Sequence, residues 1–357
     1  MRRYSALHWA APQPNKRAYN LAMLPYALAR ALLFRLDAET AHDLTLGGLA
    51  RLGCLLPGAR EAAVAPVRVM GLDFPNRIGL AAGLDKNGEA ITGLSRLGFG
   101  FLEIGTVTPR AQAGNPKPRL FRLVAQEALI NRMGFNNKGV AALLDNVRRA
   151  NFAGILGINI GKNADTPIAR AADDYLLGLE QVYAQASYVC VNISSPNTRN
   201  LRQLQDAEQL AALLSALKTR QAELAQRHGR YVPLALKIAP DLQAEEILAI
   251  ADTARRLRVD ALIATNTTVS RQGLPPNALS QQPGGLSGAP LFEPSTEVLR
   301  ALVAALAGEL PVIAAGGVDS GARAAAKIAA GAQLVQLYTG LIYRGPDLVR
   351  ECVRATQ

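Results

Sequence analysis

The sequence predicts a (β/α)8 barrel preceded by a short helical segment. From residue 77 onward, short apolar runs rich in β-branched residues end abruptly in Gly, Asn, Thr, Ser or Lys, and amphipathic stretches separate them. Strands that alternate with helices are typical of parallel βα units. Hydrophobic residues make up 49% of the chain, which is ample for a core. The eight runs are RIGLAAG, FGFLEIGTV, GILGINIG, YVCVNISS, PLALKIAP, DALIATNTT, PVIAAGG and QLVQLYTG.

The amphipathic stretches between these runs include residues 206–227, 245–257 and 320–330. A doubly wound sheet is the alternative fold, but it needs a Gly-rich turn after its first strand. The chain contains no GxGxxG sequence, and GINIGKN (157–163) differs from the Walker A pattern in its spacing and lacks the final Ser or Thr. The barrel is therefore preferred.

Two segments depart from the repeat. Residues 67–76, VRVMGLDFPN, predict a short hairpin ahead of the first barrel strand, with Gly71 in its turn. Residues 118–135, PRLFRLVAQEALINRMGF, alternate like a second hairpin. We expect this insertion to fold over the barrel mouth, where a long structured loop usually serves binding.

The N-terminal region predicts two short helices. Residues 21–36 are apolar but interrupted by Pro25, Arg30 and Arg35, so they are too short and too charged for a bilayer span of about 20 apolar residues. They also lack a small-residue cleavage site. Asp37 is the expected N-cap of the second helix. These helices could lie on a membrane surface or cap the core. The expected domains are an extension at 1–20, for which disorder is an open alternative, a helical domain at 21–56 and a barrel at 57–357.

Charge and cysteine content narrow the functional classes. The formal net charge is +11, but no Lys/Arg block is interleaved with aromatic residues, so nucleic acid is not the expected partner. Small acidic ligands or an anionic membrane surface agree with this charge. Cys54, Cys190 and Cys352 are far apart and form no CxxC or Cys/His cluster. We therefore expect a reducing compartment and no metal site.

The functional residues of such barrels lie at the C-terminal ends of the strands. Lysines and asparagines gather there, and such groups can hydrogen-bond a flat heterocycle that carries carbonyls and a carboxylate. AAGGVDSG (314–321) and YTGLIYRGP (338–346) resemble a phosphate cradle, although glycines also occur in tight turns. Lys237 could lie beside a cofactor ring that gains negative charge, as reduced flavin does. The strand ends supply Lys86, Thr106, Asn159, Asn192, Ser195, Lys237, Thr265, Asn266, Gly316, Gly317, Tyr338 and Thr339.

The motifs at these positions resemble the dihydroorotate dehydrogenase family, specifically its quinone-linked, membrane-associated class. The resemblance extends over roughly residues 37–350, and the motifs occur in the family's order. They are AAGLDKNGE, EIGTVTP, GNPKPRLFRL, INRMGFNNKG, INIGKN, VNISSPNTRNLR, LKIAPD, TNTT, GGLSG and GGVDS.

This resemblance implies a cofactor and a substrate with defined contacts. It implies oxidation of (S)-dihydroorotate to orotate in de novo pyrimidine (UMP) biosynthesis, with FMN as hydride acceptor and a membrane quinone as final acceptor. The FMN residues it implies are Ala82, Gly83, Thr106, Asn159, Asn192, Lys237, Thr265, Gly288, Gly317, Tyr338 and Thr339. The substrate residues it implies are Lys86, Asn131, Arg132, Met133, Gly134, Phe135, Asn192, Asn197, Asn266 and Thr267.

The resemblance assigns the catalytic base to Ser195. This serine is not an acyl nucleophile and needs no histidine partner; it takes a proton from a ring carbon while hydride leaves the adjacent carbon. An unactivated hydroxyl is a poor base. The family is thought to drain the proton through water near Thr198 and Phe135, and the charge of Lys86 would stabilise the developing anion.

Cys190 is a rival base, because the soluble class of the family uses cysteine. Strand alternation places Cys190 on the same face as Asn192 but deeper in the barrel, so we interpret it as a core residue.

The resemblance also gives the N-terminal helices a function. They would form an apolar vestibule for the quinone, lined in part by His42 and Arg122. Without the resemblance, His42 would be an ordinary helix-surface residue and Arg122 an ion-pairing hairpin residue. The resulting expectation is a monomer bound peripherally to the anionic cytoplasmic face of the cell membrane.

Two rival functions are weaker. A tRNA dihydrouridine synthase would share an FMN barrel but require a cysteine acid near the flavin and an RNA-binding domain, and neither is visible. A basic protein that only binds membranes or nucleic acid would leave the asparagines and lysines at the strand ends unexplained.

Overall fold

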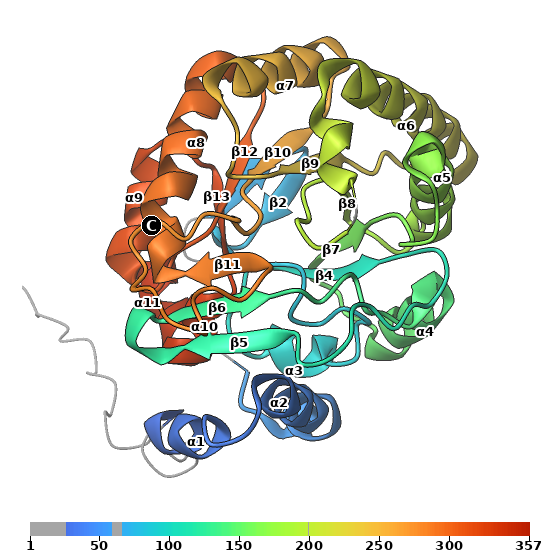
Figure 1. The fold of residues 1–357 in the computed structure, drawn as a ribbon. Helices are drawn as coiled ribbons and strands as arrows, with labels where there is room; N and C mark the ends of the chain where they lie inside the picture. Colours follow the sequence, from blue (N-terminus) through green and yellow to red (C-terminus); the bar gives the residue numbers. More distant parts are fainter. Residues whose placement is uncertain (1–25, 59–65, 199) are drawn as a thin grey trace, which may run out of the picture.

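The computed structural model describes residues 26–58, 66–198 and 200–357. The expected extension at residues 1–20 lies outside the described residues. Eight parallel strands close into a barrel in the order β10-β12-β13-β3-β4-β7-β8-β9 (Figure 1). Each corresponds to one of the eight runs, so the predicted fold is confirmed. The strands are β3 (Ile78–Leu80), β4 (Phe101–Val107), β7 (Ile155–Ile160), β8 (Tyr188–Asn192), β9 (Leu234–Ile238), β10 (Ala261–Ala264), β12 (Val312–Ala315) and β13 (Leu334–Leu337).

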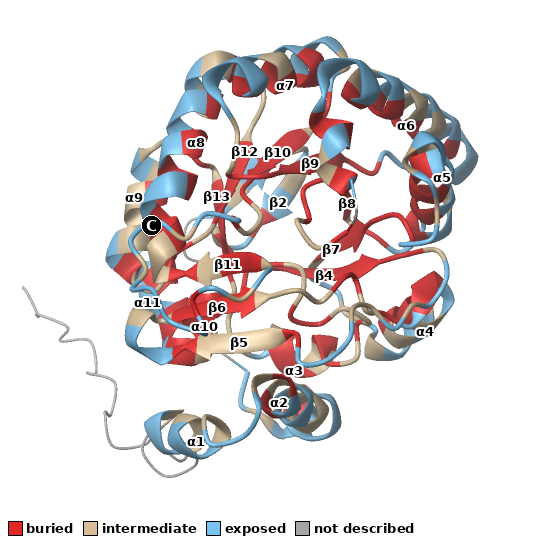
Figure 2. Ribbon diagram, viewed as in Figure 1, coloured by how far each residue is buried: buried red, intermediate tan, exposed pale blue. Residues whose placement is uncertain are grey.

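Helices surround the barrel and turn their buried faces toward the strands (Figure 2). The predicted helices at 206–227, 245–257 and 320–330 are observed as α6, α7 and α9. Local capping sets some of the ends: the Ser320 side chain accepts from Arg323 N at the start of α9, and Gln243 and Glu246 form a capping box on α7. The helices are α3 (Ile91–Ser95), α4 (Gly139–Ala150), α5 (Ala171–Val182), α6 (Ala207–His228), α7 (Ala244–Arg256), α8 (Phe292–Leu306), α9 (Gly321–Ala329), α10 (Thr339–Arg344) and α11 (Asp347–Ala355).

The core of the barrel has two layers. The larger lies between the strands and the surrounding helices, and the smaller fills the barrel interior. The predicted hairpin at 67–76 is confirmed as β1 (Val67–Val69) and β2 (Leu72–Phe74), with Gly71 at φ +76° in the turn. Phe74 packs edge-on against Phe101 inside the barrel, with ring centroids 5.2 Å apart. The hairpin therefore closes the end of the barrel opposite the mouth.

The predicted hairpin at 118–135 is also confirmed. It forms β5 (Leu120–Leu123) and β6 (Ala128–Asn131), and β11 (Gly285–Gly288) pairs with the other edge of β6 to complete a three-stranded sheet. The sheet lies across the barrel mouth in Figure 1. A small third core cluster lies in this sheet. β11 was not predicted as a strand, because its partner is more than 150 residues away in the sequence.

The two N-terminal helices are α1 (Tyr26–Leu33) and α2 (Ala38–Leu52), and they pack beside this sheet (Figure 1). As predicted, Asp37 caps α2: its side chain accepts from the backbone N–H groups of Glu39 and Thr40, each at 3.0 Å. Arg30 Nη1 and Tyr26 Oη donate to backbone carbonyls of α10 at 2.6 Å. Within the described residues, no helix is both long and apolar enough to cross a membrane.

A buried ion pair joins α2 to the loop that leads into β5. Both carboxylate oxygens of Glu39 accept from Arg119, the shortest contact being 2.7 Å, and both side chains are buried. Burial alone would raise the pKa of Glu39, but the hydrogen bonds and charges of Arg119 and Lys117 outweigh it and hold the pKa below its ordinary value. The stability that this pair contributes is therefore present at neutral pH and is lost as the pH falls through the lowered pKa.

We expect Glu39→Gln to lower the free energy of unfolding by roughly 3 kcal/mol or more, because it leaves the guanidinium of Arg119 buried without its counter-charge. The double variant Glu39→Leu/Arg119→Met should recover part of this loss, as measured by urea denaturation at pH 7, because it removes the uncompensated charge but also the donors to Ala113 O and Asn115 O. Asp73→Asn, which breaks the exposed Arg68–Asp73 pair, is the control and should cost less than about 1 kcal/mol. Equal losses in Glu39→Gln and the control would show that the buried pair contributes nothing special.

Candidate active site

A large cavity opens at the C-terminal mouth of the barrel. It encloses about 1190 Å³, including its open mouth, and residues from the strand ends and the β5-β6-β11 sheet line it. Most of the predicted site residues meet there. They are His42, Ala82, Gly83, Lys86, Thr106, Asn131, Met133, Gly134, Phe135, Asn192, Ser195, Asn197, Lys237, Thr265, Asn266, Thr267, Gly288, Gly317, Tyr338 and Thr339.

Four predicted residues do not line this cavity. Asn159 lies one layer deeper, where its Oδ1 accepts from the Thr106 hydroxyl at 2.5 Å. The Arg132 guanidinium points away: it donates to Gln282 and to the Pro118 carbonyl and stacks over Phe121. Thr198 is buried behind the wall, and Arg122 belongs to a second cavity described below.

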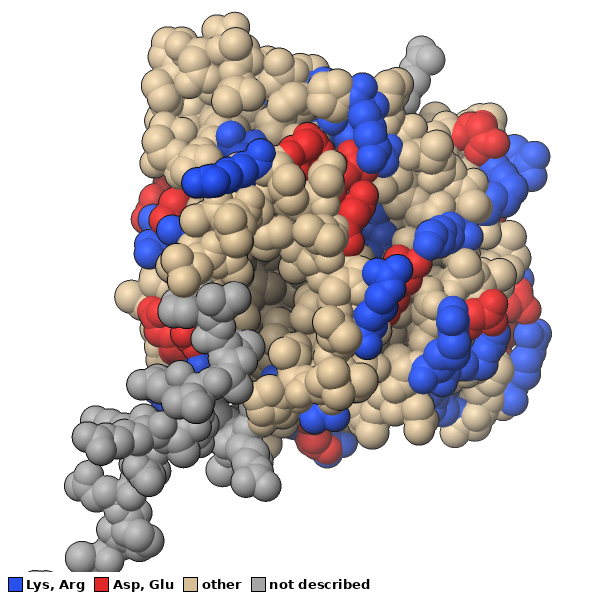
Figure 3. All heavy atoms as spheres, turned by 90° about the horizontal axis from the view of Figure 1, so that it is seen from below, with Lys and Arg blue, Asp and Glu red and all other residues tan. Residues whose placement is uncertain are grey.

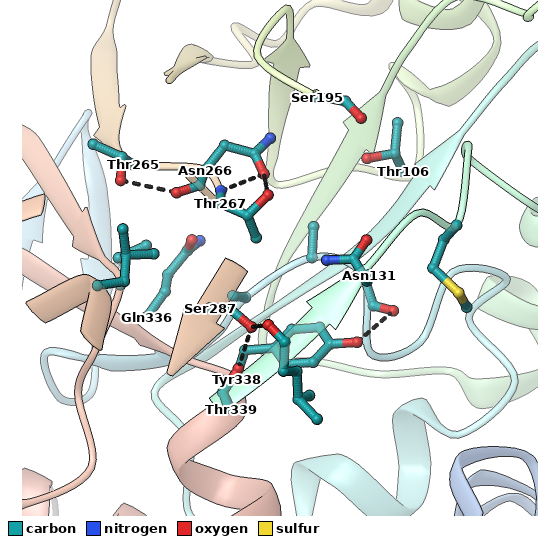
Figure 4. A pocket seen from close by; sticks show the side chains of 18 of the residues that line it. Thr106, Asn131, Ser195, Thr265, Asn266, Thr267, Ser287, Gln336, Tyr338 and Thr339 are labelled. Carbon is teal, nitrogen blue, oxygen red and sulfur yellow. Dashed lines mark hydrogen bonds between the residues drawn. The ribbon is translucent and has the colours of Figure 1, made fainter. Parts of the chain in front are cut away.

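A continuous hydrogen-bond network positions the amides at the strand ends. Asn192 Nδ2 donates to Thr106 Oγ1 at 2.9 Å, and Asn266 Nδ2 donates to Asn192 Oδ1 at 3.2 Å and to Ser194 Oγ at 3.0 Å. Across the cavity, Asn197 Nδ2 donates to Asn131 Oδ1 at 3.0 Å. The two sides of the cavity therefore present pre-oriented amide donors and acceptors. Figure 4 shows two of these amides, those of Asn131 and Asn266.

Ser195 lies on the loop after β8 and is buried. Its Oγ accepts from Asn197 N at 3.3 Å, and among the described residues no imidazole or carboxylate hydrogen-bonds it. Arg202 fixes the loop, since its guanidinium donates to Ser194 O and Thr267 O while pairing with Asp241 at 2.8 Å. The serine is held in place without an activating partner from the protein.

Lys86 supplies positive charge on the side facing α2. Its Nζ donates to Gly83 O at 3.0 Å. Burial lowers its pKa to about 8, with Glu39 opposing this effect, so the ammonium is still mainly protonated at pH 7. Burial also lowers the pKa of His42 to about 4, helped by the charge of Lys86, so this imidazole is neutral at physiological pH.

A carboxylate that the sequence analysis missed lies beneath this cavity. Glu103 is fully buried in the barrel interior and accepts from Asn159 Nδ2 at 2.8 Å, Tyr188 Oη at 2.8 Å and Gln336 Nε2 at 2.6 Å. Three converging donors are the environment that a buried carboxylate requires. The signal in the sequence was a glutamate inside the apolar run FGFLEIGTV.

Gln336 was also missed. Its amide is buried and lines the cavity, and its Nε2 is bound to Glu103. Its Oε1 is one of two buried side-chain acceptors without a hydrogen-bond partner among the described residues. An orphaned acceptor at the wall of a cavity fits a ligand that brings an N–H donor.

The interpretation of Cys190 as core is confirmed. It is fully buried within the barrel interior, where its Sγ accepts from Asn159 Nδ2 at 3.0 Å. Burial and then the charge of Glu103 raise the pKa of the thiol well above its ordinary value. A thiol that stays protonated is not a competent base.

Glycines line one end of the cavity and form what we call the cradle: Gly288, Gly316, Gly317 and Gly340. A Cβ at Gly317 would lie 2.3 Å from Phe292 N, and one at Gly340 would lie 2.1 Å from Val318 O. Gly288 and Gly317 also have positive φ values of +97° and +74°. Only glycine fits here, and the resulting bare backbone suits an anionic group such as a phosphate.

A second, apolar cavity of about 680 Å³ lies between α1, α2 and β5. Arg122 lies at its edge, with its guanidinium 4.7 Å from the Phe34 ring centroid and donating to Leu36 O. His42, Leu120, Leu129 and Tyr338 line both cavities. The two spaces are therefore neighbours that share one wall.

A barrel with a polar cavity at its C-terminal mouth and a glycine cradle after its last two strands is the architecture of a (β/α)8 enzyme that binds a phosphorylated ligand. The family model described as dihydroorotate dehydrogenase matches residues 64–356, and the chain belongs to this family.

Relatives of known name agree over nearly the whole chain. "Dihydroorotate dehydrogenase (quinone)" of Aromatoleum aromaticum is 66% identical over 331 residues, covering 93% of this chain and 95% of the relative. The protein of the same name from Azoarcus sp. is 65% identical, with 93% and 98% coverage. The crystal structure of DHODH from Eimeria tenella in complex with ferulenol superimposes with a TM-score of 0.84 at 38% identity, covering 89% of this chain and 90% of that one.

Glu103→Gln should lower the free energy of unfolding by about 2 kcal/mol or more, because the amide turns a donor toward groups that are themselves donors. Chemical denaturation of the purified variant measures this. The control is Glu309→Gln on the surface, where the partner Arg255 is exposed and the expected loss is below about 1 kcal/mol. If Glu103→Gln were as stable as that control, the hydrogen bonds from the three donors would not need the negative charge of Glu103.

Proposed function

We propose that the chain is an oxidoreductase that oxidises (S)-dihydroorotate to orotate in the mouth cavity and passes the electrons to a membrane quinone, as a step of de novo pyrimidine (UMP) biosynthesis. The observation that carries this proposal is the meeting of Ser195, Lys86 and the asparagines at 131, 192, 197 and 266 around one cavity. Membership of the dihydroorotate dehydrogenase family supports it.

In this proposal the substrate is bound by charge and by amide hydrogen bonds. Lys86, mainly protonated at pH 7, pairs with the substrate carboxylate. The asparagines offer donors and acceptors to the cyclic ureide. Hydrogen bonds already orient the Asn192 amide and the Asn197–Asn131 pair before the substrate binds. Met133, Gly134, Phe135 and Thr267 form the surrounding wall. Arg132 would contribute its backbone, since its guanidinium is directed elsewhere.

Ser195 is proposed to take the proton from the substrate ring carbon. Its hydroxyl accepts from Asn197 N, and Arg202 fixes the loop that carries it, so the serine is held for this purpose without an activating partner from the described residues. The positive charge of Lys86 stabilises the negative charge that develops on the substrate. The proton would leave through water past Phe135 and the buried Thr198.

The family is flavin-dependent, and we propose FMN as the cofactor of this chain. When bound, FMN supplies the hydride acceptor. Two features support the fit: the cradle for a phosphate, and the orphaned Gln336 Oε1 for an N–H donor of the ring. Lys237 and Asn192 would hold the ring from the barrel side, Asn159 would act by fixing Thr106, and the remaining contacts are those predicted from the sequence: Ala82, Gly83, Thr265, Gly288, Gly317, Tyr338 and Thr339.

The apolar cavity between α1 and α2 is the proposed quinone site. Arg122 and His42, whose imidazole is neutral, line its walls. Leucines on these helices are exposed, among them Leu28, Leu32 and Leu44. A hollow opens on this face, surrounded mainly by uncharged residues (Figure 3). The exposed leucines support peripheral membrane binding, and the net charge of +11 agrees with an anionic surface such as the cytoplasmic face of the cell membrane. A monomer suffices, since one chain lines both cavities.

We expect Ser195→Ala to retain FMN and to bind orotate, but to reduce the flavin at least a hundredfold more slowly, because loss of a general base typically costs about 10²–10⁴-fold. Rapid-mixing measurement of flavin bleaching by dihydroorotate tests this. Ser195→Cys should recover part of the rate as the pH is raised, since a thiolate is a competent base. Reduction of Ser195→Ala at the wild-type rate would refute the assignment of the base.

The quinone site is best tested by filling it. Deleting α2 would also remove Glu39 and leave the buried Arg119 without its counter-charge. Ala41→Leu adds bulk to a buried residue that lines only the apolar cavity. The leucine side chain would occupy space that the quinone needs, so the KM for decylubiquinone should rise roughly tenfold, which corresponds to about 1.4 kcal/mol of lost binding free energy. Flavin reduction by dihydroorotate should stay within twofold of wild type. Ala50→Leu, on the exposed face of α2, is the control. An unchanged KM for decylubiquinone in Ala41→Leu would refute the assignment of the quinone to this cavity.

A further inference from the structure

Lys327 of α9 is a buried cation that the proposed reaction does not use. It is fully buried, and its Nζ donates to Ser295 Oγ at 2.7 Å and to Phe292 O at 3.4 Å. The Nζ also lies 5.0 Å from the centroid of the Phe292 ring. Among the described residues it pairs with no carboxylate. A buried lysine without a counter-ion is costly, so it calls for a functional reason.

The two residues that Lys327 contacts form the back of the cradle. Ser295 Oγ donates to Gly316 O at 3.1 Å, and a Cβ on Gly316 would lie 2.9 Å from Ser295 Oγ. The Phe292 backbone is in such close contact with Gly317 that a Cβ there would meet its N and Cα at 2.3 Å. The ammonium of Lys327 therefore lies one residue behind the glycines that face the cavity.

Arg323, one turn earlier on α9, reaches the same place. Its Nη1 donates to Gly317 O at 3.1 Å, and its guanidinium lies 4.8 Å from the Phe292 ring centroid. However, the same Nη1 is paired with Asp319 at 2.5 Å, so its charge is largely compensated. Among the residues that the structure describes, Lys327 is the cation behind the cradle that forms no ion pair with a carboxylate, although Glu293 is near enough to favour its charge.

We propose that Lys327 is a positioning and specificity-determining residue: its buried ammonium, relayed through Ser295 and Phe292, stabilises the dianionic phosphate of a flavin mononucleotide in the cradle and so selects the phosphorylated cofactor over riboflavin. This inference rests on the proposed function, because it takes the cradle to hold the phosphate of FMN. The direct contacts to that phosphate come from the cradle backbone, and Lys327 acts behind them.

The titration of Lys327 gives this proposal a distinctive signature. Burial lowers its pKa to about 7; Arg300 of α8 and Arg323 of α9 lower it too, whereas Glu293 of α8 raises it. A phosphate dianion in the cradle favours the ammonium and so raises this pKa. Binding then takes up a proton between pH 7 and the raised pKa. The affinity for FMN is therefore highest near pH 7 and falls as the pH rises through that interval.

The test compares FMN with riboflavin in Lys327→Met. Dissociation constants are measured on flavin-stripped full-length protein between pH 7 and pH 9, where the phosphate, with a second pKa of about 6, stays a dianion. At pH 7 the variant should bind FMN about tenfold more weakly, the size expected for one charge acting through partly buried surroundings. Riboflavin binding should change less than twofold. The fall of FMN affinity with pH, present in wild type, should disappear.

Lys162→Met is the matched control. Lys162 is a similarly buried lysine after β7, four strands around the barrel from β12, and its Nζ donates to the carbonyls of Asn163 and Thr166. This variant should keep the preference of wild type for FMN and its pH dependence. A loss of that preference in Lys162→Met as large as in Lys327→Met would overturn the specific role of Lys327.

The remaining outcomes separate the inference from the proposed function. Equal weakening of FMN and riboflavin in Lys327→Met would show a merely structural role and overturn the inference. Should this variant not fold, the wild-type protein decides: a pH-dependent loss of FMN but not of riboflavin supports the proposal, and parallel curves overturn it. A wild-type protein that binds neither flavin would refute the proposed cofactor itself.

Discussion

The hydrogen bonds to the buried carboxylate of Glu103 are the interaction on which the geometry of the barrel mouth depends. A charge at this depth is tolerated only when donors satisfy it, and those donors come from β7, β8 and β13 while Glu103 itself belongs to β4. Glu103 orients Asn159, and Asn159 accepts the hydroxyl hydrogen of Thr106. The Thr106 oxygen in turn accepts a hydrogen bond from the Asn192 amide. The network thus runs from the barrel interior to the substrate wall through Glu103, Asn159, Thr106, Asn192, Asn266 and Ser194. Side chains far apart in sequence are thereby oriented before any ligand arrives, which is the condition for efficient catalysis.

A second network joins the N-terminal helices to the same site. Arg119, besides pairing with Glu39, donates to the carbonyls of Ala113 and Asn115, and the Asn115 side chain donates to Arg132 O and, at 3.4 Å, to Asn197 O. The helical segment is therefore anchored to the loops that present the substrate-side asparagines. The helices before the expected domain boundary at residue 56 thus contact the barrel loops directly through the Glu39–Arg119 pair. The shared wall of the two cavities, formed in part by His42 and Tyr338, places the proposed quinone site next to the proposed flavin site.

Sequence reasoning located those parts of the molecule that local patterns determine. The eight strands follow from their apolar runs, the start of α2 from Asp37, and the rim residues from the rule that parallel strands end together. Other residues escaped it because their environment depends on closure of the barrel. Glu103 and Gln336 become partners only when β4 and β13 lie on either side of β3, and β11 becomes a strand only when it meets β6. Lys327 occupies a helix position at which a lysine normally faces solvent, and only the packing of α9 against α8 shows that it is buried.

Two lysines with lowered pKa values show how such a site relates to the stability of the fold. Burial depresses the pKa of both Lys86 and Lys327. In each case the unfolded chain holds its proton more tightly than the folded one, so the cost is largest below the folded pKa and disappears as the pH rises toward the ordinary lysine value. Each of these cations lies near a negative charge of a proposed ligand. The substrate carboxylate would lie near Lys86, and the cofactor phosphate would lie in the cradle in front of Lys327. An anion bound at either place offsets the desolvation of the lysine and stabilises the folded state by mass action. The fold therefore carries a local instability at each anion site, and the proposed ligands are what relieve it.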